Sequence, residues 1–258
     1  MDTITLLSKR EIAKMRVAGQ LAGQLLVHLE QFVRPGVSTL ELNDEAERWT
    51  QAHGAKSAPL GYGKEGKRPA FPKSICTSLN EVVCHGIPSS KQVLKNGDVM
   101  NIDVTLIVDG YHGDTSKMYF VGEPTEEAKR LVEVTEKCRA LGIEQVKPGN
   151  RIGDIGAAIQ EYAESQGFSV VRDFVGHGIS HIFHTEPQIA HYGEWGTGKK
   201  MRAGMVFTIE PMINVGTYEV KLLRDQWTAI TKDRKLSAQC EHTIAVVEGG
   251  YEILTLPE

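Results

Sequence analysis

The chain has 258 residues, a formal net charge of −4 and 41% hydrophobic residues, which is ordinary for a protein that buries a large core. The charge balance gives no sign of a nucleic-acid-binding surface. No stretch reaches the roughly 20 apolar residues of a membrane span, and the first residues lack the apolar core of a signal peptide. The four cysteines form no Cys-x-x-Cys pair. We therefore expect reduced thiols in a cytoplasmic protein with no membrane partner.

The first 54 residues predict two helices. A capping box at Ser8 opens a helix that reaches about Phe32. An Arg-Pro-Gly sequence then interrupts the helical pattern, and a second capping box at Ser38 opens a helix that ends at Gly54.

Residues 101–115, NIDVTLIVDGYHGDT, predict two strands joined by a tight Asp109-Gly110 turn. In this register Thr105 faces Asp114, and Asp103 is the diagonal neighbour of Asp114 on the same face of the hairpin. The two carboxylates would repel each other unless one stayed protonated or a divalent cation lay between them. The hairpin alone is equally compatible with two solvated aspartates.

The second half of the chain repeats the organisation of the first. A helix near residues 125–146 is followed by one that ends at Gly167, and RPGVSTLELNDEAERWTQAHGA aligns without gaps on KPGNRIGDIGAAIQEYAESQGF. Farther along each half, KNGDVMNID aligns on RAGMVFTIE, which places Asp103 opposite Glu210. We therefore predict one domain, residues 1–258, with an internal repeat of about 8–122 and 123–258. If the two copies pack about a pseudo-twofold axis, Asp103 and Glu210 meet at its centre.

Two later stretches add polar residues. His177 lies between two glycines, which let the backbone pass close to a neighbouring segment, and Glu241 begins an apolar, strand-like run. His242 follows Glu241, and the alternation of side chains along a strand points it to the opposite face. Five other histidines fit ordinary surface or core positions: His28, His53, His112, His181 and His191.

Six motifs, in this order, resemble those of the type I methionine aminopeptidases, a family with the pita-bread metallopeptidase fold. They are NEVVCHGIP (80–88), NIDVTLIVDGYHGDTS (101–116), GHGI (176–179), FHTEP (183–187), FTIEP (207–211) and SAQCEHT (237–243). The resemblance covers nearly the whole chain. It implies an α+β fold whose duplicated helix-helix-strand halves surround a central curved antiparallel sheet. It also implies five metal ligands: Asp103, Asp114, His177, Glu210 and Glu241.

By this resemblance the five ligands hold two divalent ions. Four carboxylates with one imidazole and no thiolate suit Co, Mn or Fe, and Zn is also compatible. The resemblance assigns Asp114 and Glu241 to both ions, Asp103 to one ion, and His177 and Glu210 to the other. It further implies three catalytic side chains: Glu210, which takes a proton from the attacking water, His184, which stabilises the developing oxyanion, and His85, which contacts the peptide nitrogen.

The resemblance also implies a substrate pocket. Beside His85 and His184, its lining residues would be Tyr62, Phe71, Cys76, Phe183 and Trp227. For each of these, ordinary core packing is the alternative. Asn80, Val82 and Ser237 match a site for a monovalent cation, Na or K, that the family contains.

One segment departs from the family pattern. Between Tyr62 and Phe71 the chain carries Lys64 to Ala70, an insertion with a net charge of +2, and this leaves the register of Tyr62 open. We expect a mobile, non-catalytic flap at the pocket mouth. It is either a solvated insertion without a role, or a contact for acidic stretches of a nascent chain or for ribosomal RNA.

The function that these features predict is cotranslational removal of the initiator methionine, with a preference for a small second residue. The expected partners are the N-termini of nascent polypeptides, with a transient ribosome contact and no sequence-specific nucleic acid, and we expect a monomer. Two alternatives are a proline-directed aminopeptidase or dipeptidase of the same fold, and a non-catalytic binding module on that fold. Binding modules of this kind typically lose metal ligands, whereas this chain keeps all five.

Overall fold

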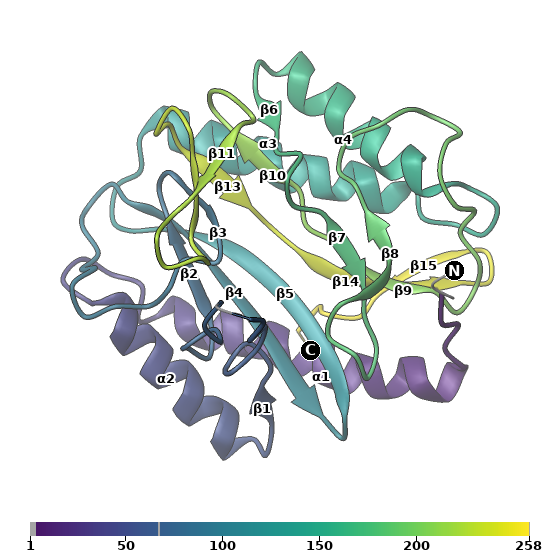
Figure 1. The fold of residues 1–258 in the computed structure, drawn as a ribbon, viewed down its shortest axis with the longest axis horizontal. Helices are drawn as coiled ribbons and strands as arrows, with labels where there is room; N and C mark the ends of the chain where they lie inside the picture. Colours follow the sequence, from purple (N-terminus) through teal and green to yellow (C-terminus); the bar gives the residue numbers. More distant parts are fainter. Residues whose placement is uncertain (1–3, 67, 258) are drawn as a thin grey trace.

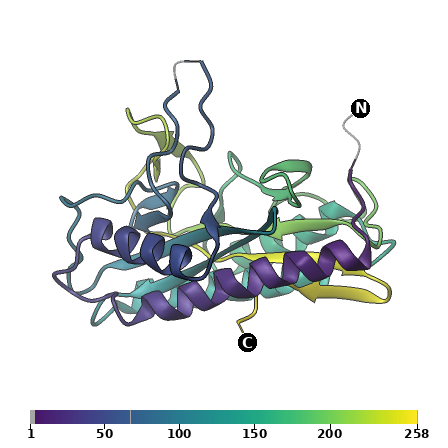
Figure 2. The ribbon, with the colours of Figure 1, turned by 90° about the horizontal axis from the view of Figure 1, so that it is seen from below.

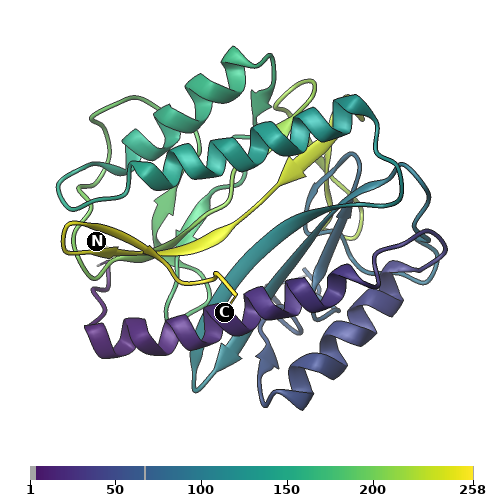
Figure 3. The ribbon, with the colours of Figure 1, turned by 180° about the vertical axis from the view of Figure 1, so that it is seen from behind.

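The computed structural model describes residues 4–66 and 68–257. A pair of helices followed by a series of strands occurs twice along the chain, once in each half (Figure 1). The described helices lie together on one side of the strands, as the view from behind shows (Figure 3). Loops between the strands project on the other side (Figure 2). This confirms the predicted α+β fold, with one face of the strands covered by helices and the other free to build a site.

Local side-chain caps explain where the helices begin. In α1 (Lys9–Glu30) the Ser8 hydroxyl accepts from the Glu11 amide, and the Glu11 carboxylate accepts from the Ser8 amide at 2.8 Å. The predicted capping box at Ser38 opens α2 (Thr39–Ala52) in the same way. The other two helices are α3 (Glu126–Glu144) and α4 (Ile152–Ser165). Among the described residues, no helix is both long and apolar enough to cross a membrane.

The central hairpin has the predicted register. Strands β4 (Val99–Val108) and β5 (Tyr111–Phe120) pair along their whole length, and Thr105 faces Asp114. Asp109 and Gly110 both have positive φ, 48° and 80°, as a type I′ turn requires. Two shorter strands, β1 (Lys56–Ser57) and β2 (Cys76–Leu79), flank β4 on its other edge.

The remaining strands form three further sheets in the described part of the chain. A five-stranded sheet has the order β15-β14-β9-β7-β8, and two three-stranded sheets have the orders β13-β10-β6 and β11-β12-β3. An isolated bridge from Ser116 to Glu241 joins the first half to the second. The bounds of these strands are β3 Val82–Cys84, β6 Ser169–Val170, β7 Gly176–Gly178, β8 Thr185–Ile189, β9 Val206–Ile209, β10 Met212–Asn214, β11 Val220–Leu222, β12 Ala229–Thr231, β13 Ser237–Gln239, β14 His242–Val247 and β15 Gly250–Ile253.

The aligned segments of the two halves share their backbone geometry. Gly36 and Gly149 have φ values of 90° and 97°, and each donates its amide to the carbonyl of an aligned residue, Leu94 or Met201. Gly97 and Gly204 have φ values of 93° and 94° and donate to Val121 and Val246. The same turns therefore lead into β4 and β9. Asp103 lies on β4, and Glu210 directly follows β9.

Two of the hydrophobic clusters hold the strands against the helices, one beneath α1 and α2 and the other beneath α3 and α4. In the first, buried residues of α1 and α2 pack on β2, β4 and β5. The contact between α1 and the hairpin is close, because a Cβ on Gly113 would lie 2.3 Å from the Gly19 amide nitrogen. Asp114 is the next residue, so the packing of α1 on β5 fixes its position. All four cysteines are free of disulfides, in agreement with the reduced thiols that the sequence predicts, and all four are buried.

Candidate metal centre

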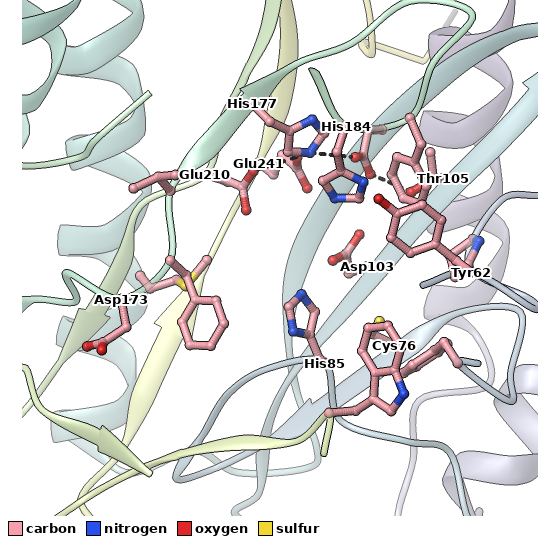
Figure 4. Close-up of a pocket in the computed structure, with 18 of the residues that line it drawn as sticks. Tyr62, Cys76, His85, Asp103, Thr105, Asp173, His177, His184, Glu210 and Glu241 are labelled. Atoms are coloured by element: carbon pink, nitrogen blue, oxygen red, sulfur yellow. Dashed lines mark hydrogen bonds and ion pairs between the residues drawn. The ribbon is translucent and has the colours of Figure 1, made fainter. Parts of the chain in front are cut away.

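The five predicted ligands line one cavity of about 390 Å³ between the two halves (Figure 4). Asp114, His177 and Glu241 each offer one ligand atom, and these atoms lie within 4.8 Å of one another. Asp114, Glu210 and Glu241 are buried. Each residue belongs to a different strand or strand end, so the centre exists only when both halves are packed together.

Asp114 is fixed at three points. Its Oδ1 accepts from the Thr105 hydroxyl at 2.7 Å, and the Thr243 hydroxyl donates to its carbonyl, also at 2.7 Å. The other carboxylate oxygen, Oδ2, lies 3.5 Å from His177 Nε2. The hydroxyl of Thr105 thus turns one carboxylate oxygen away and leaves the other facing the imidazole.

The position of His177 depends on its two glycine neighbours. A Cβ on Gly176 would lie 2.4 Å from the Thr208 carbonyl oxygen, and one on Gly178 would lie 2.1 Å from the Glu186 carbonyl oxygen. The ring Nδ1 lies 3.1 Å from the Gly178 carbonyl, which can only accept, so Nδ1 carries the hydrogen. Nε2 therefore faces the carboxylates of Asp114 and Glu210, the second at 3.8 Å. Burial opposes protonation of His177, but these two carboxylates outweigh it and raise its pKa. Only a proton or a metal ion makes this arrangement favourable.

Glu210 is held from both sides. Its Oε1 accepts from the Thr208 hydroxyl at 2.7 Å, and its Oε2 accepts from the Gln239 amide at 3.2 Å. Its backbone amide donates to Nε2 of the buried His191 at 3.0 Å. Burial raises the pKa of Glu210 to about 7 even though His177 lowers it. A carboxylate in this state is poised to exchange a proton near neutral pH.

The other two carboxylates share the same electrostatic conflict. Burial, together with Asp114 and Glu210, raises the pKa of Asp103 and of Glu241 well above the ordinary value. The backbone amide of Glu241 donates to the Ser116 carbonyl at 3.1 Å, which anchors the second half to β5. Four carboxylates this close cannot all be ionised without a counter-charge. Divalent cations supply that charge, and the set of oxygen donors with one imidazole suits them.

Two histidines project into the cavity without adding charge. His85 and His184 approach Asp103 from opposite sides in Figure 4. Burial lowers the pKa of His184 to about 2, and burial together with Arg68 lowers the pKa of His85 to about 4. Both rings are therefore neutral near pH 7, and each can donate one hydrogen bond to a bound substrate. His85 has a φ of 57°, an uncommon value for a residue with a side chain.

The predicted apolar residues form one wall of this cavity. Phe71, Cys76 and Trp227 are buried in one cluster, and the rings of Phe71 and Trp227 meet edge to face with centroids 5.3 Å apart. The ring of Tyr62 lies 4.9 Å from those of Phe183 and His184, so the insertion does not remove Tyr62 from the cavity.

The three predicted monovalent-cation ligands lie outside the cavity lining. The Ser237 amide donates to the Asn80 carbonyl at 2.9 Å, and Val82 begins β3 two residues after Asn80. The buried hydroxyl of Ser237 has no hydrogen-bond partner among the described residues. A buried hydroxyl oxygen without such a partner could serve as a ligand of a monovalent cation.

Sequence reasoning did not find every residue of the site. Thr208 holds both His177 and Glu210, and its place two residues before Glu210 on an alternating strand was a usable signal. His191 occupies an ordinary buried position, as predicted, yet it also orients Glu210. Arg68, inside the insertion, lines the cavity together with Asp173. Lys67 of the insertion lies outside the described residues.

The remaining histidines agree with the sequence analysis. His242 turns away from the cavity and pairs with the Thr255 hydroxyl at 2.8 Å. His28 pairs with Glu45, His53 contacts the Trp49 carbonyl, and His112 contacts the Ser180 carbonyl. His181 is exposed.

Comparison with known proteins places this geometry in a family context. The sequence profile of metallopeptidase family M24 matches residues 13–248. Methionine aminopeptidase A of Synechocystis sp. is 71% identical over 257 residues, which cover 100% of this chain and 99% of that protein. Methionine aminopeptidase of Escherichia coli K12 is 51% identical over 255 residues, which cover 98% of this chain and 94% of that protein.

Solved structures give the same result. The crystal structure of methionine aminopeptidase from Rickettsia prowazekii superposes with a TM-score of 0.95 at 50% identity, covering 98% of this chain and 100% of that one. The prolidase from Pyrococcus furiosus superposes with a TM-score of 0.78 at 21% identity, and the match covers 66% of that chain. This second likeness concerns the fold alone.

Proposed function

The chain belongs to metallopeptidase family M24, and from this premise we propose that it is a methionine aminopeptidase that removes the initiator methionine from nascent polypeptides. The observation that carries the proposal is the convergence of four carboxylates and one imidazole beside an apolar wall in one cavity. The relatives that match the full length at 71% and 51% identity are methionine aminopeptidases. The chain is thus a metallo-aminopeptidase of the type I class with the pita-bread fold.

The residues of the cavity fit two divalent ions. The residues that would hold them are Asp103, Asp114, His177, Glu210 and Glu241. When bound, the ions supply Lewis acidity and a water of lowered pKa. The fit rests on two features: a His177 ring whose Nδ1 faces the Gly178 carbonyl, so that Nε2 points at the carboxylates, and raised pKa values at Asp103, Glu210 and Glu241.

The side chains of this protein would then divide the work of peptide hydrolysis. Glu210, whose carboxylate faces the cavity, accepts a proton from the attacking water. His184 donates a hydrogen bond to the oxygen of the scissile carbonyl as negative charge develops there. His85 contacts the peptide nitrogen next to the scissile bond. Phe71, Cys76 and Trp227 accept the methionine side chain, whose sulfur gains about 0.3–1.5 kcal/mol from each aromatic contact.

Finer features of the proposal concern partners and organisation. We infer a single catalytic domain with an internal repeat, a monomer in the cytoplasm, a small second residue in the substrate and a transient ribosome contact. The metals would be Co, Mn, Fe or Zn. The Ser237 hydroxyl, which has no hydrogen-bond partner among the described residues, supports a monovalent cation, Na or K, as a further ligand.

The deciding experiment is release of free methionine from a Met-Ala-Ser peptide, with and without chelator. We expect release that chelator abolishes and that added Mn or Co restores. Parallel assays with Met-Pro and Ala-Pro peptides address a proline-directed enzyme, which would cleave these faster than Met-Ala-Ser. Absence of cleavage of every peptide at saturating metal would instead indicate a binding module.

A further inference from the structure

The insertion between Tyr62 and Phe71 is a narrow hairpin that is fastened to Trp227. The amide of Phe71 donates to the Tyr62 carbonyl at 2.8 Å, and the Gly61 amide donates to the Phe71 carbonyl at 2.9 Å. Figure 2 shows the described part of this segment projecting from the face of the molecule that carries the loops. Its inner arm contacts the cavity wall, so the insertion is more than a surface appendage.

Three contacts clamp the indole of Trp227 to the hairpin. The Trp227 Nε1–H donates to the Pro69 carbonyl at 2.9 Å. The tip of the ring lies so close to Gly63 that a Cβ there would be 2.5 Å from Cη2. The guanidinium of Arg68 stacks over the ring, with its Cζ 3.6 Å from the centroid. Stacking of this kind holds the charged end of Arg68 in one place.

Arg68 lacks a carboxylate partner in the part of the chain that the structure describes. Its side chain forms no ion pair there, and its buried Nε–H has no hydrogen-bond acceptor. Arg68 nevertheless lines the same cavity as the metal cluster. A guanidinium that offers Nε–H and an Nη–H side by side is matched by the two oxygens of a carboxylate.

The charge balance of the cavity singles out the same residue. Two divalent ions would offset Asp103, Asp114, Glu210 and Glu241. Arg68 and Asp173 then remain as the charged side chains of the lining, with opposite signs. Among the described side chains of the lining, Arg68 is therefore the cation that remains to attract an anionic group of the substrate.

We propose that Arg68 is a specificity-determining residue that binds an acidic side chain of the substrate on the carboxyl side of the scissile bond. The inference rests on the proposed aminopeptidase function. In such a substrate the methionine carries an ammonium group and a thioether, neither of which is an anion, so a carboxylate can only come from the residues that follow. Because the second residue is expected to be small, the acidic residue is the third or the fourth.

The test compares kcat/KM for amidated peptides of the form Met-Ala-X-Ala and Met-Ala-Ala-X, where X is Asp or Asn. Amidation removes the C-terminal carboxylate, and the Asp/Asn ratio cancels any general change in activity. Partly exposed charge pairs usually alter binding by about two- to fivefold, so we expect the Asp peptide to be favoured by this factor at one position. The preference should appear in KM and shrink as salt rises.

Variants of the hairpin separate charge from packing. Arg68→Met keeps an unbranched side chain over Trp227 without its charge and should bring the Asp/Asn ratio to about one, whereas Arg68→Lys should retain part of the preference. Lys64→Met removes one charge from the exposed part of the same hairpin and should leave the Asp/Asn ratio at its wild-type value.

An Asp/Asn ratio of about one in the wild type at both positions, or an unchanged preference in Arg68→Met, would overturn the assignment of Arg68. In both cases neutral peptides would still release methionine, so the proposed function would stand. No release from any peptide at saturating metal would instead overturn the proposed function.

Discussion

Replacement of Glu210 by glutamine should separate two effects of this carboxylate. One is the free energy of unfolding that its charge costs in the metal-free protein, and the other is its catalytic function. The substitution keeps the shape of the side chain. Its Oε1 can still accept from Thr208. The Gln239 amide, which donates to Glu210 Oε2 in the wild type, can turn over so that its Oε1, a buried oxygen without a partner among the described residues, accepts from the new NH2 group. We therefore expect Glu210→Gln to fold normally and to lose one buried negative charge.

The magnitude follows from the pKa of Glu210, which rises from 4.5 to about 7 on burial. A higher pKa in the folded state means that the protonated form stabilises the fold below about pH 4.5. That stability is lost as the pH rises through 7. At about 1.4 kcal/mol per pKa unit, ionising Glu210 in the metal-free protein costs about 3 kcal/mol at pH 8. At pH 5 the cost falls below about 1 kcal/mol, because Glu210 is still protonated in the folded state.

Urea unfolding of chelator-treated protein at pH 8 and pH 5 measures this cost. We expect the free energy of unfolding of Glu210→Gln to exceed that of the wild type by about 3 kcal/mol at pH 8 and by much less at pH 5. Glu127→Gln, on an exposed face of α3, should match the wild type at both values. At saturating metal, Glu210→Gln should lose methionine release by at least about 10²-fold, as expected for loss of a general base. Equal metal-free stability of the wild type and Glu210→Gln at pH 8 would refute the electrostatic reasoning, and near-normal release would refute the catalytic assignment.

Three further predictions use other parts of the site. His184→Ala should lower kcat by about 10²–10³ while affinity for free methionine changes little, because an oxyanion exists only in the transition state; an equal loss of affinity would make His184 a ground-state binding residue. Since burial lowers the pKa of His191 to about 3, the unfolded chain takes up its proton first, and stability falls as the pH drops from about 6.5 toward 3. The wild type should lose about 2 kcal/mol of its free energy of unfolding between pH 7 and pH 5 because of His191, and His191→Gln should not lose this amount in urea unfolding. The same loss in the variant would contradict a neutral His191. Gly178→Ala should cost about 1–3 kcal/mol and weaken Mn binding in calorimetry, because the new Cβ meets the Glu186 carbonyl at 2.1 Å; Gly250→Ala, which meets nothing within 4 Å, is the control. Equal behaviour of the two glycine variants would show that β7 tolerates the methyl group.

Sequence patterns that act over a few residues were sufficient to predict the local structure. Both capping boxes join residues three apart, so the starts of α1 and α2 follow from Ser8 and Ser38 alone. The Asp109-Gly110 turn likewise sets the β4–β5 register, and with it the side-by-side placement of Asp103 and Asp114. Ligand types could be carried over from the family resemblance because the motifs occur in the expected order.

The tertiary structure alone decided how these residues interact. Ser116 meets Glu241 across 125 positions of the chain, and His191 reaches the Glu210 amide from a loop with no motif of its own. The contact of Arg68 with Trp227 joins an insertion to a residue 159 positions later. The raised pKa of Glu210 and the lowered pKa of His184 arise mainly from burial, which exists only after the two halves have packed. Local propensity depends on neighbours along the chain, whereas desolvation and convergence of charge depend on neighbours in space.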